Sequence, residues 1–375
     1  MEDVVQGILK LTEHKVFTVR TAQHSYRPPT KEITVHPSLL HRFRLTEGAS
    51  VSGELERKGG RHRLMTIETL GGLTPEQFYT RPRFNDLVAV DPHRRFNLGA
   101  GGDPSMRIVD LIAPIGKGTR QLIVSPPRAG KTVILEQMAR AIHKDCPDVR
   151  ILVLLIDERP EEVTNFRRAV QGVEVVASTS DHTADEHVDL AGLILAHVQT
   201  ELECGRHVVL MIDSLTRIGR AFNNRTRGHN GSRPTMSGGL ESGVLEVPRR
   251  LFGLARNVEN GGSVTIVATC LVDTGSRMDQ LIFEEFKGTG NSELVLDRSI
   301  AEARVWPAID IPASGTRKEM KLYEPKQIEP ITTLRRVLSR YHGRDAVEAL
   351  HKLLSRFPTN EAFLTHMANV KWDSL

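Results

Sequence analysis

The chain has 375 residues, 39% of them hydrophobic and 26% charged, which excludes a largely disordered protein and, at about 150 residues per domain, predicts two or three domains. Its longest apolar runs, such as Ile151–Ile156, are far shorter than the roughly 18 residues of a membrane helix, and its first residues form no secretory leader. Three widely spaced cysteines, Cys146, Cys204 and Cys270, fit neither a disulfide framework nor a zinc site, so we expect a soluble, cytoplasmic protein without membrane contact.

The formal net charge of +4 comes entirely from the N-terminal end of the chain. Residues 1–100 hold 15 Lys and Arg against 11 Asp and Glu, whereas residues 101–375 hold 35 of each kind. A basic excess confined to one module is typical of polyanion binding. Ordinary scatter of charged residues explains an excess of this size equally well, so the charge alone leaves both interpretations open.

Residues 1–72 have the pattern of a small β-barrel. Turn-forming residues separate five short β-prone runs, which are Val4–Leu11, Val16–Arg20, Ile33–Val35, Ala49–Leu55 and Arg63–Glu68. Five such runs in about 70 residues predict an all-β OB-fold barrel of the cold-shock type. Several Pro and Gly residues interrupt residues 73–112, and we interpret that stretch as a linker.

Residues 113–375 alternate buried strands with helices. Strands covered on both faces are expected at the continuous apolar runs Gln121–Val124, Arg150–Ile156, Val173–Ala177, His207–Ile212 and Ser263–Leu271. Residues 131–144, 185–203 and the tail 332–370 instead repeat apolar side chains at helical spacing. This alternation predicts an α/β domain with a parallel sheet, followed by C-terminal helices.

The sharpest motif is Ser125-Pro126-Pro127-Arg128-Ala129-Gly130-Lys131-Thr132, which lies between the first of these strands and the first helix. This context indicates a phosphate-binding loop; the alternative is a chance Gly-Lys-Thr, and Ser125 stands where a glycine is usual. Backbone amides at the helix N-terminus would hold the β-phosphate of ATP. Lys131 would reach the β- and γ-phosphates, and the Thr132 hydroxyl would bind Mg²⁺.

Two acids follow predicted strands at the sheet edge where α/β proteins bind ligands. Asp213 ends the fourth strand and is expected to hold Mg²⁺, although an Asp in this place is often only a strand end. Glu158 lies just beyond the second strand, where a carboxylate would take a proton from the attacking water. The alternative for Glu158, or for Asp157, is to cap the helix that begins near Glu161.

Further candidates lie downstream of these motifs. Arg304 or Arg317 would stabilise γ-phosphate charge in a neighbouring subunit, with a surface salt bridge as the alternative. Trp306 would stack on adenine, although such a residue more often belongs to a core. We expect mobile loops at 225–239 and 273–290, which would grip a phosphate backbone or be ordinary surface loops.

Five long motifs follow one another in a single order along the chain. They are 126–132, 155–164, 213–217, 284–291 and 314–319, and they make the chain resemble bacterial transcription termination factor Rho from about residue 4 to the C-terminus. The resemblance implies a ring-shaped homohexamer whose RecA-like ATPase domain occupies residues 113–375. It also implies an enzyme that uses ATP and Mg²⁺ to move 5′ to 3′ along single-stranded RNA, unwinds RNA–DNA hybrids and displaces RNA polymerase.

The resemblance gives roles to individual residues of the ATP site. Glu158 matches the catalytic glutamate, Asp213 the Mg²⁺-linked acid and Arg317 the arginine finger that acts on a neighbouring subunit, with Arg304 a second candidate. ATP contacts fall on Gly116, Lys117, Gly118, Thr119, Arg120, Gln121, Arg128, Ala129, Gly130, Lys131, Thr132, Val133 and Arg159, and adenine stacking falls on Trp306.

The resemblance also implies two RNA-binding surfaces. The primary site on the barrel maps to Lys15, Val16, Phe17, Thr18, Val19, Arg20, Glu32, Ile33, Thr34 and Arg61, and the secondary site in the central channel to Thr235, Met236, Ser237, Gly238, Gly239, Arg277 and Lys287. The barrel departs from the family pattern, because it keeps one aromatic platform, Phe17, and has Thr34 where tyrosine is frequent. Since stacking contributes about 1–3 kcal/mol per base, we expect phosphate contacts to dominate RNA binding by the barrel and its selectivity for pyrimidines to be weak.

Two other classes of function are alternatives. Subunits of ATP synthases and of type III secretion ATPases share the RecA-like core and a small N-terminal barrel, but the basic barrel argues against them. An RNA-binding regulator with a decayed ATPase is the non-enzymatic alternative, and the intact Lys131, Glu158 and Asp213 argue against it.

Overall fold

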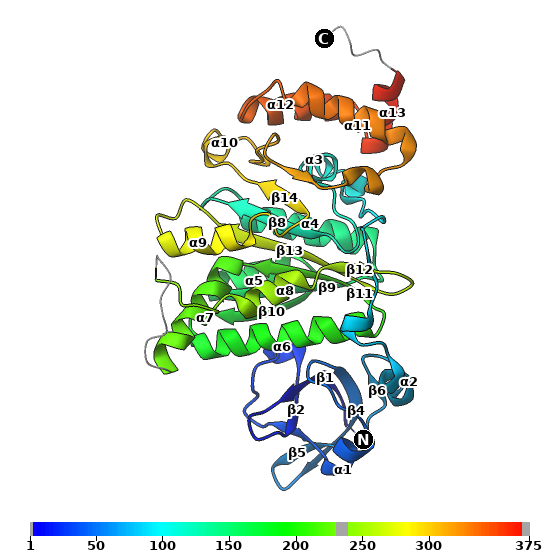
Figure 1. The fold of residues 1–375 in the computed structure, drawn as a ribbon, viewed down its shortest axis with the longest axis vertical. Helices are drawn as coiled ribbons and strands as arrows, with labels where there is room; N and C mark the ends of the chain where they lie inside the picture. The colour runs from blue at the N-terminus through cyan, green and yellow to red at the C-terminus, as the bar shows by residue number, and fades with distance from the viewer. Residues whose placement is uncertain (1–2, 230–238, 370–375) are drawn as a thin grey trace.

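The computed structural model describes residues 3–229 and 239–369, which form three tiers (Figure 1). The barrel lies at one end and a parallel sheet covered by helices lies in the middle. The last helices, α11 (Pro325–Leu338), α12 (Arg344–Leu354) and α13 (Asn360–Asn369), lie at the other end and confirm the predicted helical tail. None of the helices in the two described ranges is long and apolar enough to cross a bilayer.

The N-terminal strands form a closed barrel, which confirms the OB-type prediction. The order is β1–β2–β3–β5–β4–β6, and β4 also pairs with β1, so five strands close on one another. Their bounds are β1 (Asp3–Leu11), β2 (Phe17–Arg20), β3 (Ile33–Val35), β4 (Ser50–Lys58), β5 (Arg61–Leu64) and β6 (Thr69–Leu70). β5 begins earlier than the predicted run at residue 63, because Gly59 and Gly60 both have positive φ and form a two-residue hairpin turn.

The interpretation of residues 73–112 as an irregular linker is wrong for its last part. After α2 (Pro75–Thr80) and the short strand β7 (Ala89–Val90), the chain forms α3 (Pro104–Ile112), whose residues from Met106 onward are all buried. The Asp103 carboxylate caps α3 by accepting a hydrogen bond from the Met106 amide at 3.0 Å. The sequence analysis missed α3 because Pro104 was taken as a breaker, although proline is well suited to the first turn of a helix.

The central sheet has the order β10–β9–β11–β13–β8–β14–β15, and all of its neighbours on this path are parallel except β15. The strands are β8 (Arg120–Ser125), β9 (Arg150–Glu158), β10 (Glu174–Thr179), β11 (His207–Asp213), β13 (Ser263–Leu271), β14 (Ser292–Val295) and β15 (Gly315–Thr316), with β12 (Arg256–Val258) between β13 and β7. Alternate residues of β9 belong to two different buried clusters, one on each face of the sheet. This burial on both faces explains the continuous apolar runs in the sequence.

Helices cover both faces of the sheet, and two of them replace expected loops. The helices are α4 (Lys131–Asp145), α5 (Pro160–Ala169), α6 (Ala184–Glu203), α7 (Leu215–His229), α8 (Glu246–Gly253), α9 (Arg277–Phe286) and α10 (Arg298–Glu302). The loop expected at 225–239 begins as the last turns of α7, and most of the loop expected at 273–290 is α9. Ser276 caps α9, and the α9 carboxylate of Asp279 pairs with Arg220 of α7, so both helices gain support that their polar sequences do not reveal.

Candidate ATP site and candidate RNA surfaces

The phosphate loop has the predicted surroundings. β8 ends at Ser125 and α4 begins at Lys131, so the loop joins a central strand to a helix N-terminus. Gly130 is the N-cap of α4 with φ of 85°, and a Cβ added there would lie 2.6 Å from the Trp306 ring. Only glycine satisfies both constraints. The first amides of α4 therefore remain available to an anion.

Three charged side chains converge beside this loop. The Lys131 ammonium contacts a carboxylate oxygen of Asp213, and Lys131 Nζ lies 3.6 Å from Glu158 Oε1. Asp213, 2% exposed, also accepts a hydrogen bond from the Thr269 hydroxyl at 2.9 Å. Glu158 is 3% exposed. Since β9 and β11 are parallel neighbours, their carboxyl ends bring the two predicted acids together at one edge of the sheet.

A bulge in β9 directs the side chain of Glu158. Asp157 has φ of 57°, and the register with β10 shifts after Ile156, so that Glu158 lies opposite Thr179. A bulge of this kind turns the following side chain toward a different direction. The N-cap of α5 is Arg159, so neither Asp157 nor Glu158 occupies the capping position that was the alternative to catalysis.

Arg217 is a site residue that the sequence analysis did not single out. It lies on α7, four residues after Asp213; its Nη2 donates to Glu158 Oε2 at 3.2 Å, and its Nη1 donates to the carbonyl of Asp157. Its Nε lies 3.0 Å from Glu158 Oε1. The conjunction of an acid at a strand end and an arginine one helical turn later was the available signal, since one turn brings the guanidinium back over the sheet edge.

The surroundings of Glu158 hold its carboxyl protonated near neutral pH. Burial is the main cause and the charge of Asp213 the second, and together they raise the pKa of Glu158 to about 8. Lys131 and Arg217 act in the opposite direction and do not compensate. A carboxyl group with a pKa near the working pH is suited to proton transfer.

The donor groups fit a magnesium ion that arrives with a nucleotide. Asp213 and the half-exposed Thr132 offer the oxygen ligands that Mg²⁺ prefers, whereas the Glu158 carboxylate already faces Arg217 and Lys131. Within residues 3–229 and 239–369, no three His, Cys, Asp or Glu side chains cluster so as to hold a metal by themselves. A Mg²⁺ ion at this edge would therefore need phosphate oxygens and water as further ligands.

Other predicted nucleotide contacts lie at the same edge of the sheet. Trp306, 45% exposed, places its ring against Gly130, and its carbonyl accepts a hydrogen bond from His351 Nε2 at 2.7 Å. Arg304, Arg128 and Arg159 are exposed. Of the two other predicted contacts, Ala129 in the phosphate loop is buried and Val133 in α4 is exposed. The structure thus brings Trp306 to the phosphate loop and leaves these arginines open to solvent.

A second group of predicted ATP residues lies at the opposite edge. Residues 116–121 precede β8 or begin it, so the length of that strand separates them from the phosphate loop. Two of their amides are held by hydrogen bonds within the subunit: the Gly116 amide donates to the Thr119 hydroxyl and the Gly118 amide to the Thr265 hydroxyl, both at 2.8 Å. Arg317 follows β15 at this same edge, and its amide donates to the Asn291 carbonyl at 2.7 Å. Within one subunit, neither Arg317 nor residues 116–121 join the phosphate-loop site.

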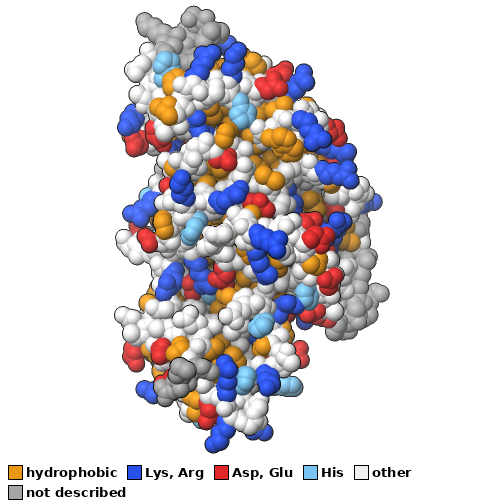
Figure 2. Space-filling view, turned by 180° about the vertical axis from the view of Figure 1, so that it is seen from behind, with side chains coloured by type: hydrophobic (Ala, Val, Ile, Leu, Met, Phe, Trp, Pro, Cys, Tyr) orange, Lys and Arg blue, Asp and Glu red, His pale blue; other side chains and the backbone are white. Residues whose placement is uncertain are grey.

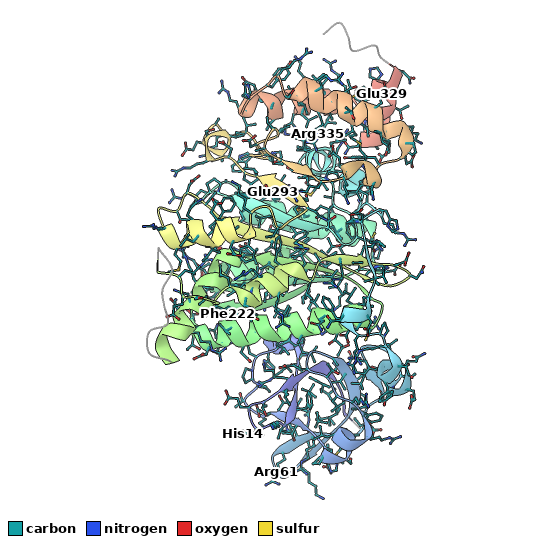
Figure 3. All side chains as sticks on the ribbon, viewed as in Figure 1. His14, Arg61, Phe222, Glu293, Glu329 and Arg335 are labelled. Atoms are coloured by element: carbon teal, nitrogen blue, oxygen red, sulfur yellow. The ribbon has the colours of Figure 1, made fainter. Side chains whose placement is uncertain are left out.

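The predicted RNA contacts on the barrel are mostly buried or paired. Phe17 packs against the barrel core, so the expectation of a freely stacking ring is wrong, because β2 turns this side chain inward with Val19. Thr18, Val19 and Ile33 are buried, Thr34 is half-buried, and Arg20, only 5% exposed, pairs with Glu32 at 3.3 Å. Lys15, Val16 and Arg61 are exposed, and Arg61 projects from the tip of the barrel (Figure 3).

The predicted channel contacts are only partly within the described residues. Thr235, Met236, Ser237 and Gly238 lie outside them. Gly239 is described, and its carbonyl accepts a hydrogen bond from the Asn223 side chain at 3.1 Å. Arg277 and Lys287 are exposed at the two ends of α9, in keeping with a surface role.

Known proteins resemble the chain in both of its main parts. Residues 105–316 match the ATP synthase alpha/beta family, nucleotide-binding domain. Transcription termination factor Rho of Aquifex aeolicus is 44% identical over 97% of this chain and 84% of its own length. Rho of Haemophilus influenzae is 43% identical over 96% of this chain and 87% of its own length.

A solved ATPase from the type III secretion system of pathogenic bacteria shares the fold. It covers 84% of this chain and 93% of its own, with a TM-score of 0.63 and 21% identity. This likeness confirms the P-loop ATPase fold behind a small barrel. The similarity to the Rho proteins is far higher in sequence and includes the barrel, the phosphate loop and the C-terminal helices. The chain therefore belongs to the transcription termination factor Rho family.

Proposed function

We propose that the chain is an RNA-stimulated ATPase that assembles as a homohexameric ring, moves 5′ to 3′ along single-stranded RNA and terminates transcription by displacing RNA polymerase. The observation that carries this proposal is the buried cluster of Lys131, Glu158 and Asp213 beside the phosphate loop of a Rho-family chain. A regulator that only bound RNA would have no need for a buried carboxyl whose pKa is raised toward the working pH beside a phosphate loop.

Each group at the site would have a separate role in ATP hydrolysis. The amides at the start of α4 would hold the β-phosphate, and Lys131 would leave Asp213 for the β- and γ-phosphates. Glu158 would accept the proton of the attacking water, and Arg217 would hold the carboxylate in place. Mg²⁺, held by Thr132 and Asp213, would neutralise charge on the phosphates. Trp306 would stack on the adenine.

The position of Arg317 favours action between subunits. It lies at the amino edge of the sheet, whereas the phosphate loop lies at the carboxyl edge of the same subunit. In a ring with head-to-tail contacts, one subunit's amino edge would face the next subunit's phosphate loop. Arg317, with residues 116–121 beside it, would then complete a neighbour's ATP site, while Arg304 would remain at its own. A cavity of about 150 Å³ lined by Thr119, Thr316 and Arg317 leaves room at that edge.

The proposal is tested by the ATPase rate against homopolymer RNAs and single-stranded DNAs. We expect RNA to stimulate turnover, and single-stranded DNA of the same length serves as the matched control. A rate that no polynucleotide changes would contradict the proposal and favour a secretion or proton-coupled ATPase, whose fold this chain shares. RNA binding without any turnover would instead favour a regulator with a decayed ATPase.

A further inference from the structure

Residues 25–27, in the loop that joins β2 to β3, link the barrel to the ATPase domain, and we call them the interdomain loop. Figure 1 shows α6 between the barrel and the central sheet, and Figure 2, seen from behind, shows the two parts in direct contact. Tyr26 is buried in the hydrophobic cluster on one face of that sheet and not in the cluster of the barrel. Ser25 and Tyr26 both have positive φ, with values of 51° and 56°. Residues other than glycine adopt this conformation rarely, so contacts with the ATPase domain must stabilise it.

Ser25 connects the interdomain loop to two elements of the ATPase domain at once. Its buried hydroxyl oxygen accepts hydrogen bonds from Arg167 of α5 at 2.9 Å and from the Ala177 amide of β10 at 3.1 Å. Arg167 also donates to the Val175 carbonyl of β10 at 3.3 Å. Ser25 therefore helps to hold α5 against the edge strand of the sheet.

Arg27 makes a second attachment, to the turn that follows β10. Its guanidinium donates to Nε2 of His182, since a guanidinium has no acceptor. Nδ1 of the same ring then carries the proton, and it lies 2.9 Å from the Thr179 hydroxyl and 3.2 Å from the Thr179 carbonyl. Arg27 thus holds His182, and His182 in turn holds the last residue of β10.

Glu158 lies between these two attachments. Thr179 is its partner residue on β10, and the Ser180 amide donates to the Glu158 carbonyl at 3.0 Å. α5, the helix that the same loop holds, begins just beyond Glu158. A bulge such as the one at Asp157 interrupts the regular ladder and re-aims the side chain beside it, so the contacts of β10 and α5 decide where the Glu158 carboxyl points.

From these contacts we propose that Ser25 and Arg27 are positioning residues for ATP hydrolysis, which hold β10 and α5 so that the Glu158 carboxyl keeps its buried position. The inference rests on the proposed function, because it takes Glu158 as the group that accepts a proton from water. It deepens that function, because it gives the barrel a part in the chemistry of its own subunit through protein contacts alone.

The test compares Ser25→Ala with Ser50→Ala in the full chain. Both substitutions remove a barrel hydroxyl that is bonded to the ATPase domain, but Ser50 donates to Glu201 at 3.0 Å, beside Arg150 at the start of β9 and away from Glu158. With saturating homopolymer RNA, we expect Ser25→Ala to lower kcat for ATP about 10-fold, a part of what a general base contributes. KM for ATP should not change, because the phosphate loop is untouched, and Ser50→Ala should change neither constant.

Arg27 provides a second pair of variants. Arg27→Ala should lower kcat in the same way, again without a change in KM. Arg27→Lys keeps a donor that can reach His182 and should recover most of the activity. This pair keeps the proposal testable if Ser25→Ala does not fold.

The pH dependence of turnover separates a positioning role from a loss of folded protein, because the midpoint of a pH profile does not depend on how much enzyme is active. Burial is the main reason that the pKa of Glu158 is raised to about 8, so a carboxyl that is no longer held in place should have a pKa closer to its ordinary value. We expect the midpoint to fall below about 8 in Ser25→Ala and Arg27→Ala but not in Ser50→Ala. None of these substitutions removes a charged group that faces Glu158; those groups are Asp213, Lys131, Arg217 and Glu162.

Two outcomes are distinguishable from the expected one. If RNA stimulates the wild type but Ser25→Ala and Arg27→Ala keep the kcat and the pH midpoint of Ser50→Ala, the positioning role is overturned while the proposed function stands. If RNA does not stimulate ATP turnover by the wild type, the proposed function itself fails.

Discussion

The ATP site and the barrel of this chain show two different relations between sequence and binding surface. At the ATP site, Lys131 comes from a helix N-terminus and Glu158 and Asp213 from two strand ends, and the three side chains meet within hydrogen-bonding or ion-pair range. On the barrel, the residues that resemblance assigns to RNA are divided among core positions, an ion pair between buried Arg20 and exposed Glu32, and exposed positions such as Lys15 and Arg61. Catalysis on a phosphate requires atoms at fixed positions, whereas binding of a polyanion requires positive charge near its backbone, which many arrangements of Lys and Arg supply.

The largest expected effect is a loss of ATP turnover without a change in RNA affinity. Lys131→Ala should lower ATP turnover by at least about 100-fold, because it removes a cation from the charge that develops on the phosphates. RNA affinity, measured by fluorescence anisotropy, should not change, because the barrel lies in another tier of the molecule. Equal loss of both activities in a folded variant would show that the two regions are not separable.

The next effect concerns the edge of the sheet that lies away from the phosphate loop. Arg317→Ala subunits mixed with wild type should lower ATPase activity by more than the mutant fraction, because each variant would disable its neighbour's site. Arg298→Ala, which removes another exposed arginine, is the matched control. Loss of activity in simple proportion to Arg317→Ala subunits would mean that Arg317 does not complete a neighbouring site.

A third prediction follows from the raised pKa of Glu158. Turnover should rise with pH through about 8, since the carboxyl must lose its proton before it can accept one from water. Because the folded state holds this proton more tightly than the unfolded state, the stability contributed by Glu158 is present at acidic pH and is lost as pH rises through about 8.

Glu158→Gln provides the control for that prediction. It should abolish the pH-dependent step in turnover. The midpoint temperature of thermal unfolding of the wild type should fall relative to that of Glu158→Gln as pH rises from about 5 to about 9. A wild-type stability that rises relative to the variant over this range would contradict the assigned direction of the shift.

The smallest effects are expected on the outer face of the barrel. Affinities for oligo(C) and oligo(A) should differ by less than about threefold, because no free aromatic platform stands among the predicted contacts within the described residues. Phe17→Leu keeps an apolar side chain against the core and should leave RNA affinity nearly unchanged, whereas Phe17→Ala should destabilise the barrel by about 1–2 kcal/mol. A strong preference for oligo(C) that persists at high salt would contradict this picture.

Much of the molecule followed from local sequence features. The phosphate loop, the two acids after buried strands and the five barrel strands were predictable, because each depends on a short pattern: alternation, a continuous apolar run or a motif at a strand end. Local pattern did not predict α3, since Pro104 and the glycines before it were taken as signs of an irregular segment. It also predicted loops where α9 and the end of α7 form helices, since the Arg220–Asp279 pair joins residues far apart in the chain.

Which groups can bind ATP follows from the sequence alone, because strand ends of a parallel sheet meet at one edge. Three features instead depend on packing: Arg217 holds Glu158, burial raises the pKa of this carboxyl, and Arg317 lies at the edge of the sheet opposite its own phosphate loop. Packing also makes Phe17 lie half-buried against the barrel core and buries Arg20. Burial, charge proximity and the convergence of distant segments are properties of packing, and no single segment of the chain contains them.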